Sequence, residues 1–258
     1  MEKTKHGSLS LVGIGTSDER GISLSGLEGL KACQKIFAEC YTNLLPEGTL
    51  QRLEALVGKK IEVLGREQVE SEKKILDAAS SQPAALVVPG DPMIATTHIS
   101  LVLAAKKRGI EVRIFHAASI LSAAIGESGL QAYKFGKTVT LAYWRENYKP
   151  MAAYDVIAEN LSRGLHTLLL LDIDEKLGPM KPSEAAKILL EMEKEGKKGI
   201  LLPKTRLVLL QGVGWQSQKT HYVSLGELAQ PVSSCQQPAV LILPGSLHFL
   251  EQEFLDAL

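Results

Sequence analysis

Short apolar segments alternate with longer segments of helical periodicity, and this pattern most restricts what the 258-residue chain can fold into. Short runs rich in Val, Ile and Leu are typical of strands buried on both faces of a largely parallel sheet. In the first half we expect strands at 9–13, 36–41, 61–64, 84–88 and 112–115, and helices at 24–33, 49–57, 70–79 and 97–107. This alternation predicts an α/β domain whose helices cover a parallel sheet.

Strands are more frequent in the second half, and helices are fewer. We expect strands at 138–142, 166–172, 207–211, 221–224 and 239–243, and helices at 152–160 and 183–193. Pro182 and Gly196 are the residue types that begin and end a helix, so they bound the last of these. We place a boundary between His116 and Ser122 and predict two α/β domains, 1–117 and 118–258.

Composition excludes several classes of protein. Lys and Arg together number 29, as do Asp and Glu, so the chain lacks the basic excess of a protein that binds nucleic acid. The cysteines Cys33, Cys40 and Cys235 form no C-x-x-C pair, which argues against a disulfide framework and fits a reducing compartment. Residues 1–8 are polar and show no apolar core of a secretory signal. No apolar run approaches the roughly 20 residues of a membrane helix. We therefore expect a cytoplasmic protein with no membrane contact.

Two loops with glycine follow predicted strands. Gly-Ile-Gly at 13–15 follows the first strand, and Pro-Gly-Asp-Pro at 89–92 follows the strand at 84–88. Open α/β sheets bind ligands at the carboxyl ends of their strands, and Asp91 could accept hydrogen bonds from ribose hydroxyls or an amino group. The alternatives stay open: a plain tight turn at 13–15, and a rigid turn in which Asp91 caps the next helix.

A third candidate is Ala-Ala-Ser-Ile at 117–120, at the proposed domain junction. Small residues permit close approach and Ser119 offers a hydroxyl, although a serine at a helix start is usually a cap. The six histidines show no metal-ligand spacing, and neither a Walker A sequence nor a G-x-S-x-G elbow occurs. The sequence therefore predicts no metal centre and gives little support to a hydrolase.

Further short sequences occur in a definite order along the chain. They are Asp-Glu-Arg at 18–20, Phe-Ala-Glu at 37–39, Tyr-Thr at 41–42, Ala-Thr-Thr-His at 95–98, His-Ala at 116–117, Tyr-Lys-Phe-Gly-Lys at 133–137, Gly-Leu-His-Thr-Leu-Leu at 164–169, Leu-Asp-Ile at 171–173, Pro-Gly at 244–245 and Leu-His at 247–248. Together with the glycine loops, this series resembles the tetrapyrrole methylase class of S-adenosylmethionine-dependent enzymes, and within it the diphthine synthase family. The resemblance covers nearly the whole chain.

The resemblance implies two α/β domains of the tetrapyrrole methylase type, with the cofactor in the cleft between them. The cofactor would be S-adenosylmethionine, which leaves as S-adenosylhomocysteine. The family's cofactor contacts correspond to Thr16, Asp91, Ile94, Ser119, Ile120, Leu171, Val213 and Ala239. Most of these contacts would be made by backbone or apolar atoms. We name no catalytic base and no metal ligand.

The resemblance also implies the reaction and the partner. The substrate would be translation elongation factor 2, on which a histidine already carries a 3-amino-3-carboxypropyl group. The enzyme would methylate the amino nitrogen of that group three times, in diphthamide biosynthesis; eukaryotic relatives are associated with a further methylation on the carboxylate. Tyr133, Lys134 and Lys137 could meet this protein substrate, or could serve ordinary packing. Members of the family are usually dimers, so we expect a homodimer.

Two alternatives remain at this stage. A methylase acting on a corrin or porphyrin precursor would share the fold and the cofactor, but would favour an Arg-rich trough that the sequence does not show. A non-enzymatic module that senses a nucleoside would explain both glycine loops equally well. It would not explain why the diphthine synthase series continues through the second domain.

Overall fold

Two compact units make up the protein, Met1–Ile120 and Leu121–Leu258, each with its own five-stranded sheet. The computed structural model describes residues 7–174, 176–230 and 238–258, so Cys235 and most of the polar N-terminal segment lie outside the described residues. We predicted the boundary after residue 117, whereas the units divide where helix α6 (Ile120–Glu127) begins. The cleft that we expect between the domains stays a prediction.

The sheet of the first unit is parallel throughout, with strand order β3-β2-β4-β1-β5. Its strands are β1 (Ser8–Gly13), β2 (Lys35–Glu39), β3 (Ile61–Leu64), β4 (Pro83–Val88) and β5 (Glu111–Phe115). Its helices are η1 (Glu19–Gly21), α1 (Leu24–Ala32), α2 (Thr49–Val57), α3 (Arg66–Glu70), α4 (Lys73–Ser81) and α5 (Ile99–Lys107). The parallel α/β architecture predicted for this half is confirmed.

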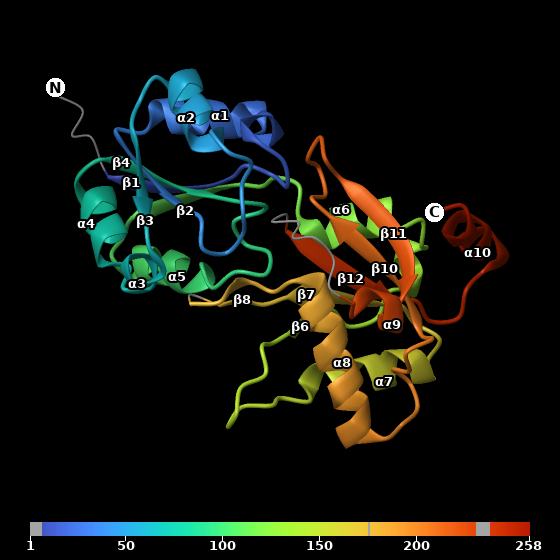
Figure 1. The fold of residues 1–258 in the computed structure, drawn as a ribbon. Coiled ribbons are helices and arrows are strands. Elements are labelled where there is room, and N and C mark those ends of the chain that lie inside the picture. The colour runs from blue at the N-terminus through green and yellow to red at the C-terminus, as the bar shows by residue number, and fades with distance from the viewer. Residues whose placement is uncertain (1–6, 175, 231–237) are drawn as a thin grey trace, which may run out of the picture. The chain divides into compact units, whose positions relative to one another are not determined.

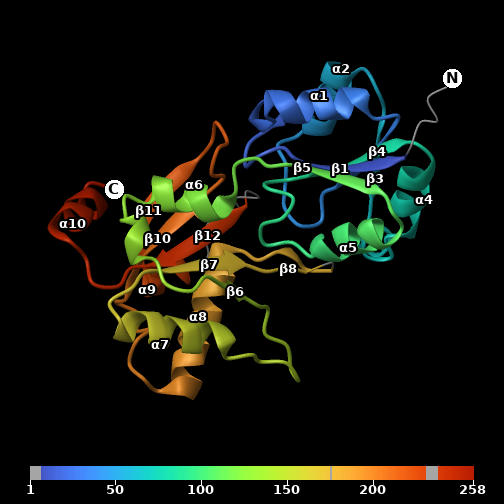
Figure 2. The same cartoon turned by 180° about the vertical axis from the view of Figure 1, so that it is seen from behind.

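Helices cover both faces of this sheet, with α1 and α2 on one side and α3, α4 and α5 on the other (Figure 1, Figure 2). Successive residues of a strand point to opposite faces. Leu9 and Leu11 of β1 accordingly belong to the core that includes α4 and α5, while Val12 and the following Ile14 belong to the core that includes α1 and α2. All four are fully buried, which explains why apolar residues occur on both faces of this strand.

Two predicted elements of this unit need correction. Residues 70–79 are not one helix, because α3 ends at Glu70 and α4 begins at Lys73. Between them Glu72 has φ 60°, a left-handed conformation that ends a helix. The predicted strand 36–41 ends at Glu39, whose carboxylate accepts hydrogen bonds from the N–H groups of Tyr41 (3.1 Å) and Thr42 (3.2 Å) and so turns the chain.

The second unit has a mixed sheet of order β11-β10-β12-β7-β6, antiparallel except between β6 and β7. Its strands are β6 (Val139–Leu141), β7 (Thr167–Leu171), β10 (Arg206–Gln211), β11 (Lys219–Ser224) and β12 (Ala239–Leu243), and β8 (Ile173–Asp174) pairs with β9 (Gly178–Pro179). Its helices are α6, η2 (Ala132–Lys134), α7 (Ala152–Ser162), α8 (Pro182–Gly196), α9 (Leu225–Leu228) and α10 (Phe249–Asp256). Each predicted strand and helix of this half is confirmed, whereas α6, α9 and α10 were not predicted.

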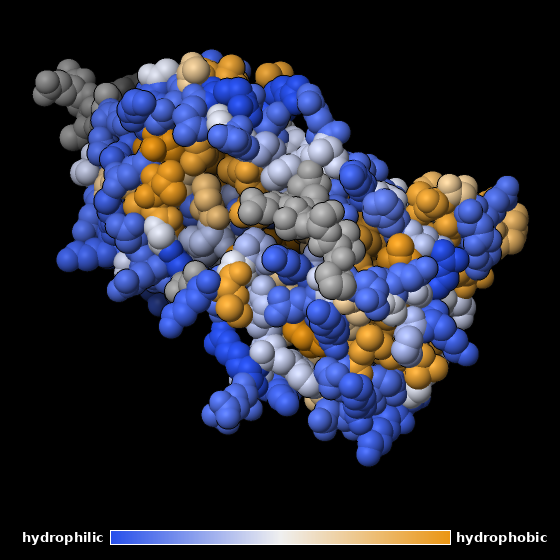
Figure 3. Space-filling view, in the orientation of Figure 1, coloured by the Kyte–Doolittle hydropathy of each residue, from blue (hydrophilic) through white to orange (hydrophobic). Residues whose placement is uncertain are grey.

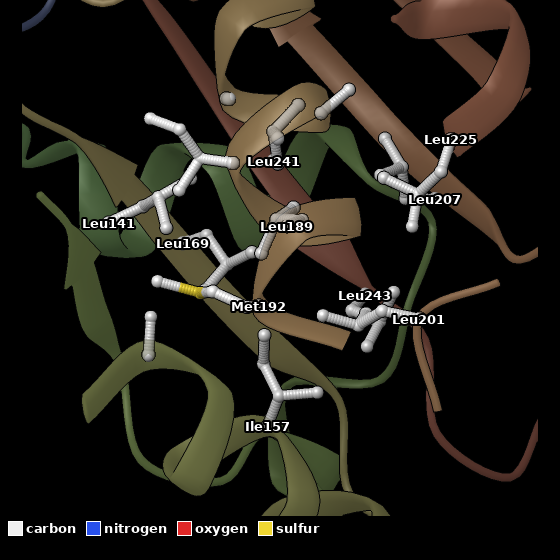
Figure 4. Packing of buried hydrophobic residues seen from close by; sticks show 14 of the residues in the cluster. Leu141, Ile157, Leu169, Leu189, Met192, Leu201, Leu207, Leu225, Leu241 and Leu243 are labelled. Carbon is white, nitrogen blue, oxygen red and sulfur yellow. The ribbon is translucent and has the colours of Figure 1, made fainter. Parts of the chain in front are cut away.

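One large apolar core holds this sheet to its helices. Figure 4 shows Leu141, Leu169 and Leu241 from the strands facing Met192 of α8 and Ile157 of α7. On the other face of the sheet lies α6 (Figure 2). Among the helices of the described residues, none combines the length and hydropathy that a membrane crossing requires.

A buried polar network lies where β7 begins and β12 ends. His166 is fully buried; its Nδ1 accepts the N–H of Gly245 (2.9 Å), so its Nε2 carries the proton and donates to Glu251 Oε1 (3.1 Å). Glu251, 1% exposed, also accepts the N–H groups of Gln131 (2.8 Å) and His248 (2.7 Å) and pairs with Lys134. The motifs at 133–137, 164–169 and 244–248 therefore meet in one structural network.

This network sets the charge of its members. Burial alone would raise the pKa of Glu251, but its bonds to His248, Lys134, Gln131 and His166 outweigh burial and lower this pKa from 4.5 to about 2. Burial lowers the pKa of His166. Glu251 is thus a buried carboxylate whose partners favour its charged form.

We predict that Glu251→Gln lowers the free energy of unfolding by about 3 kcal/mol, because it leaves Lys134 and the surrounding donors without their charged acceptor. Urea titration followed by circular dichroism measures this loss. Glu191→Gln is the matched control, since Glu191 forms an exposed ion pair with Lys194 and the change should cost no more than about 0.5 kcal/mol.

The same pair of proteins tests the pH dependence. Because the folded-state pKa of Glu251 lies below 4.5, its stabilisation is complete above about pH 4.5 and is lost as the pH falls towards 2. The stability difference between wild type and Glu251→Gln should therefore stay constant near neutral pH and shrink within that window. A difference that is unchanged down to pH 2 would contradict the assignment.

Candidate functional site

The carboxyl edge of the first sheet gathers the three loops that the sequence singles out. Strands β4, β1 and β5 are neighbours and parallel, so the loops that follow them leave the sheet side by side. Gly15 donates its N–H to the carbonyl of Gly90 (3.1 Å), and Gly90 donates to the carbonyl of Gly15 (2.8 Å). Both glycines have positive φ, 76° and 74°, which favours glycine at these positions.

Gly13 lets the three loops approach one another closely. A Cβ at this position would lie 2.5 Å from the carbonyl oxygen of Gly90, 2.9 Å from Cδ of Pro92 and 3.0 Å from Cβ of Ala117. These atoms belong to the loop after β4 and the segment after β5, and the first of them is backbone. The Gly-Ile-Gly sequence is therefore a close-packing element as well as a turn.

Asp91 joins two of these loops by hydrogen bonds. Its Oδ1 accepts the N–H of Met93 (2.9 Å), and its Oδ2 accepts from Nδ1 of His116 (2.8 Å) and from the N–H of Ala117 (3.2 Å). The side chain is 5% exposed. Asp91 thus stabilises a turn, as the rigid-turn alternative predicted, but it bonds to Met93 and does not cap α5. Its bonds to the segment after β5 were not predicted.

The proposed cofactor residues of the first unit all follow these three strands. Thr16 lies after β1, Asp91 and Ile94 lie after β4, and Ser119 and Ile120 lie after β5. Ile94 is 41% exposed, and Thr16, Ser119 and Ile120 are half-buried. The fold therefore brings these five together at one edge of the sheet, as the sequence predicted; that they bind a cofactor stays a prediction.

The three candidates of the second unit also lie together. Leu171 ends β7, Ala239 begins the neighbouring β12, and Val213 follows β10 on the other side of β12. Val240 pairs with Leu170 in the antiparallel register, so Ala239 lies beside the end of β7. Gln211 pairs with Ala239, which brings the loop after β10 to the same end of the sheet.

The residues expected to meet a protein substrate separate into different roles. Lys134 forms an ion pair with the buried Glu251 and is therefore part of the structural network. Tyr133 beside it is fully exposed. The N–H of Lys137 donates to Oδ1 of Asn160 (3.1 Å), and Lys137 itself is exposed. The ion pair with Glu251 gives Lys134 a structural role, whereas Tyr133 and Lys137 stay candidates for contact with a protein substrate.

Two polar residues, which the sequence showed only as part of the family resemblance, lie near the same carboxyl edge of the first sheet. Glu39 at the end of β2 is fully buried, and His98 before α5 is 2% exposed. Burial raises the pKa of Glu39. A carboxylate placed directly at the end of a buried strand was the signal that could have identified Glu39. Within the described ranges, no group of three or more His, Cys, Asp or Glu side chains could hold a metal ion.

Comparison with known proteins gives a consistent result. The family model described as Tetrapyrrole (Corrin/Porphyrin) Methylases matches residues 8–229. Diphthine synthase of Methanocaldococcus jannaschii is 42% identical over 254 residues, which cover 97% of this chain and 98% of the relative. Diphthine methyl ester synthase of Schizosaccharomyces pombe is 40% identical over 264 residues, covering 96% and 93%. A crystal structure of a diphthine synthase superimposes with a TM-score of 0.85 at 30% identity, covering 96% of this chain and 94% of the other.

We predict that Gly13→Ala lowers the free energy of unfolding by about 1–3 kcal/mol, because the new Cβ overlaps the carbonyl oxygen of Gly90. Thermal or urea unfolding measures the loss. Gly126→Ala is the matched control, since this exposed glycine of α6 has open space around it and alanine favours a helix by about 0.5–1 kcal/mol. Equal effects of the two changes would refute the close packing at Gly13.

Proposed function

The chain belongs to the tetrapyrrole methylase family, among its diphthine synthase members, and we propose that it transfers methyl groups from S-adenosylmethionine to a modified histidine of translation elongation factor 2. The single observation that carries the proposal is the match to diphthine synthase over 97% of the chain at 42% identity. The family makes the chain an S-adenosylmethionine-dependent methyltransferase.

The residues at the carboxyl edge of the first sheet fit such a cofactor. Apart from its two chain neighbours, no heavy atom of the described residues lies within 4 Å of the position that a Cβ of Gly90 would take, so the backbone there is open to a ligand. Ile94 presents apolar surface next to it, which suits an adenine ring. We propose that Thr16, Asp91, Ile94, Ser119 and Ile120 hold the cofactor on the first unit and that Leu171, Val213 and Ala239 hold it on the second, Asp91 acting through the loop that it organises.

The chemistry asks for alignment rather than for a strong base. When bound, S-adenosylmethionine supplies a methyl group on a good leaving group, and the acceptor is an amine that can lose its proton to water. What the chain must contribute is a rigid frame that aligns the acceptor and excludes water. The mutual hydrogen bonds of Gly15 and Gly90, and those of Asp91, supply rigidity at the proposed cofactor edge.

The number of methyl groups is the finer part of the proposal. One relative is named diphthine synthase and another diphthine methyl ester synthase, and they are 42% and 40% identical to this chain. We propose three transfers to the amino nitrogen of the 3-amino-3-carboxypropyl group. Since the protein substrate belongs to the translation machinery, we place the enzyme in the cytoplasm.

Mass spectrometry tests the reaction directly. Elongation factor 2 that carries the aminocarboxypropyl histidine is incubated with this protein and S-adenosylmethionine, and should gain three methyl masses on that residue. A fourth methyl mass would replace the proposed product by the methyl ester. No gain, in a reaction where the protein binds S-adenosylhomocysteine by calorimetry, would reject elongation factor 2 as the substrate.

The two rival functions are separated by a labelled-methyl transfer assay. Transfer to a corrin or porphyrin precursor, but not to elongation factor 2, would replace the proposal by a tetrapyrrole methylase. A protein that binds the cofactor and transfers to neither would be a sensing module.

We also propose a homodimer, as the resemblance implies. Apolar side chains exposed on α10, among them Phe249 (69%) and Leu250 (57%), offer surface that a second copy could cover, and apolar colour is visible at this helix in Figure 3. Light scattering should give twice the 28.0 kDa mass of one chain. A mass equal to one chain over the micromolar range would refute the dimer.

A further inference from the structure

His98 is a buried histidine, and within the described residues only one of its two ring nitrogens has a hydrogen-bond partner. Its Nδ1 lies 2.8 Å from the carbonyl oxygen of Pro92, and because a carbonyl only accepts, Nδ1 carries the proton. Its Nε2 is buried and has no hydrogen-bond partner among the residues that the structure describes. Buried polar atoms without partners are uncommon and need an explanation. The function proposed above does not use this residue.

The bond from His98 holds a strained loop. Ala95 has φ 56°, a left-handed conformation that is unfavourable for any residue with a Cβ. The carbonyl of Pro92, before Ala95, accepts from Nδ1 of His98 and also from Oγ1 of Thr96 (2.9 Å), so two residues that follow the strained Ala95 are tied to one carbonyl that precedes it. This explains why the Ala-Thr-Thr-His sequence follows the Pro-Gly-Asp-Pro turn.

The loop that is held carries the exposed part of the proposed cofactor edge. Gly90 and Asp91, just before Pro92, bond to the loop after β1 and the segment after β5. Ile94 lies between Pro92 and the strained Ala95. Loss of the bond from His98 would therefore loosen the segment around Ile94, which Thr96 and the bond from the N–H of Ile94 to the carbonyl of Asp91 (3.4 Å) still restrain, while Gly90 stays in place.

Glu39 orders the turn that follows β2, the strand next to β4. Its carboxylate is fully buried and accepts hydrogen bonds from the N–H groups of Tyr41 and Thr42. Because β2 and β4 are adjacent and parallel, this turn leaves the sheet beside the loop that follows β4.

We propose that His98 is a positioning residue for the cofactor: by holding the Pro92 carbonyl, together with Thr96, it keeps the loop of residues 90–95 in its binding conformation. The residue acts through the loop and not on the reacting atoms. The inference rests on the proposed use of this edge for S-adenosylmethionine, and it adds a residue that the cofactor contacts do not include.

Two substitutions at this position separate positioning from filling of space. His98→Asn keeps an N–H donor near the place of Nδ1, whereas His98→Leu fills a similar volume without a donor. We expect His98→Leu to raise the Kd for S-adenosylhomocysteine by about tenfold, the value of one lost hydrogen bond, and His98→Asn to stay near wild type. The KM for elongation factor 2 should be unchanged by either.

His166→Gln is the matched control, because His166 is also a fully buried histidine but belongs to the network at the far end of the second sheet. It should lower the melting temperature and leave the Kd for S-adenosylhomocysteine unchanged. Calorimetry below the lowest melting temperature, with the active fraction taken from the stoichiometry, removes the effect of stability.

Hydrogen exchange on the protein without cofactor gives an independent readout. The peptide covering residues 89–97 should exchange faster in His98→Leu than in wild type and at the wild-type rate in His98→Asn. Unchanged exchange in His98→Leu, or equal loss of affinity in both variants, would overturn the inference. If the wild-type protein binds no S-adenosylhomocysteine, the proposed function is wrong. The exchange result would still show whether His98 holds the loop.

Discussion

The buried carboxylate of Asp91 is the contact on which the carboxyl edge of the first unit depends. One side chain receives hydrogen bonds from its own turn and from the segment after β5, while Gly90 beside it is bonded to Gly15 after β1. Three loops, contributed by strands far apart in the sequence, thereby become one surface. Parallel strand order makes this possible, because it delivers all three loops to the same edge.

The second unit achieves rigidity in another way. Its sheet is mainly antiparallel, and its polar anchor, the Glu251 and His166 network, joins the beginning of β7 to the turn before α10. Leu171 and Ala239 lie at the opposite end of β7 and β12. Much of the ordered series of motifs along this half therefore builds the frame, while the proposed cofactor residues contribute backbone and apolar surface at the other end.

Local patterns predicted most of the secondary structure, because most strands are built mainly from apolar residues. They failed where a single residue departs from the pattern, as at Glu72, whose left-handed conformation divides a helical segment into α3 and α4. Helix α10 was missed because Phe249, Leu250 and Phe254 expose apolar side chains, which blurs the helical periodicity.

The arrangement of the candidate site was predictable to the level of strand ends. Glycine turns after apolar strands indicated the sheet edge at which the candidate residues lie, but the bonds between His116 and Asp91 and between His166 and Glu251 join residues remote in sequence, and spacing alone carries no signal for them. The Pro92 carbonyl could not be predicted for the same reason. Every residue has a backbone carbonyl, and only the fold shows that this one accepts hydrogen bonds from two side chains.

The position of β1 has a consequence for how the protein is made. This strand lies inside its sheet, yet it precedes the sheet's other strands in the chain, and its partners come much later: Ser8 pairs with Pro83 in β4 and with Glu111 in β5. Leu9, Leu11 and Val12 must therefore wait, without their native neighbours, until most of the first unit has been synthesised. Of the strands in the first sheet, β1 thus spends the longest stretch of synthesis without its partners.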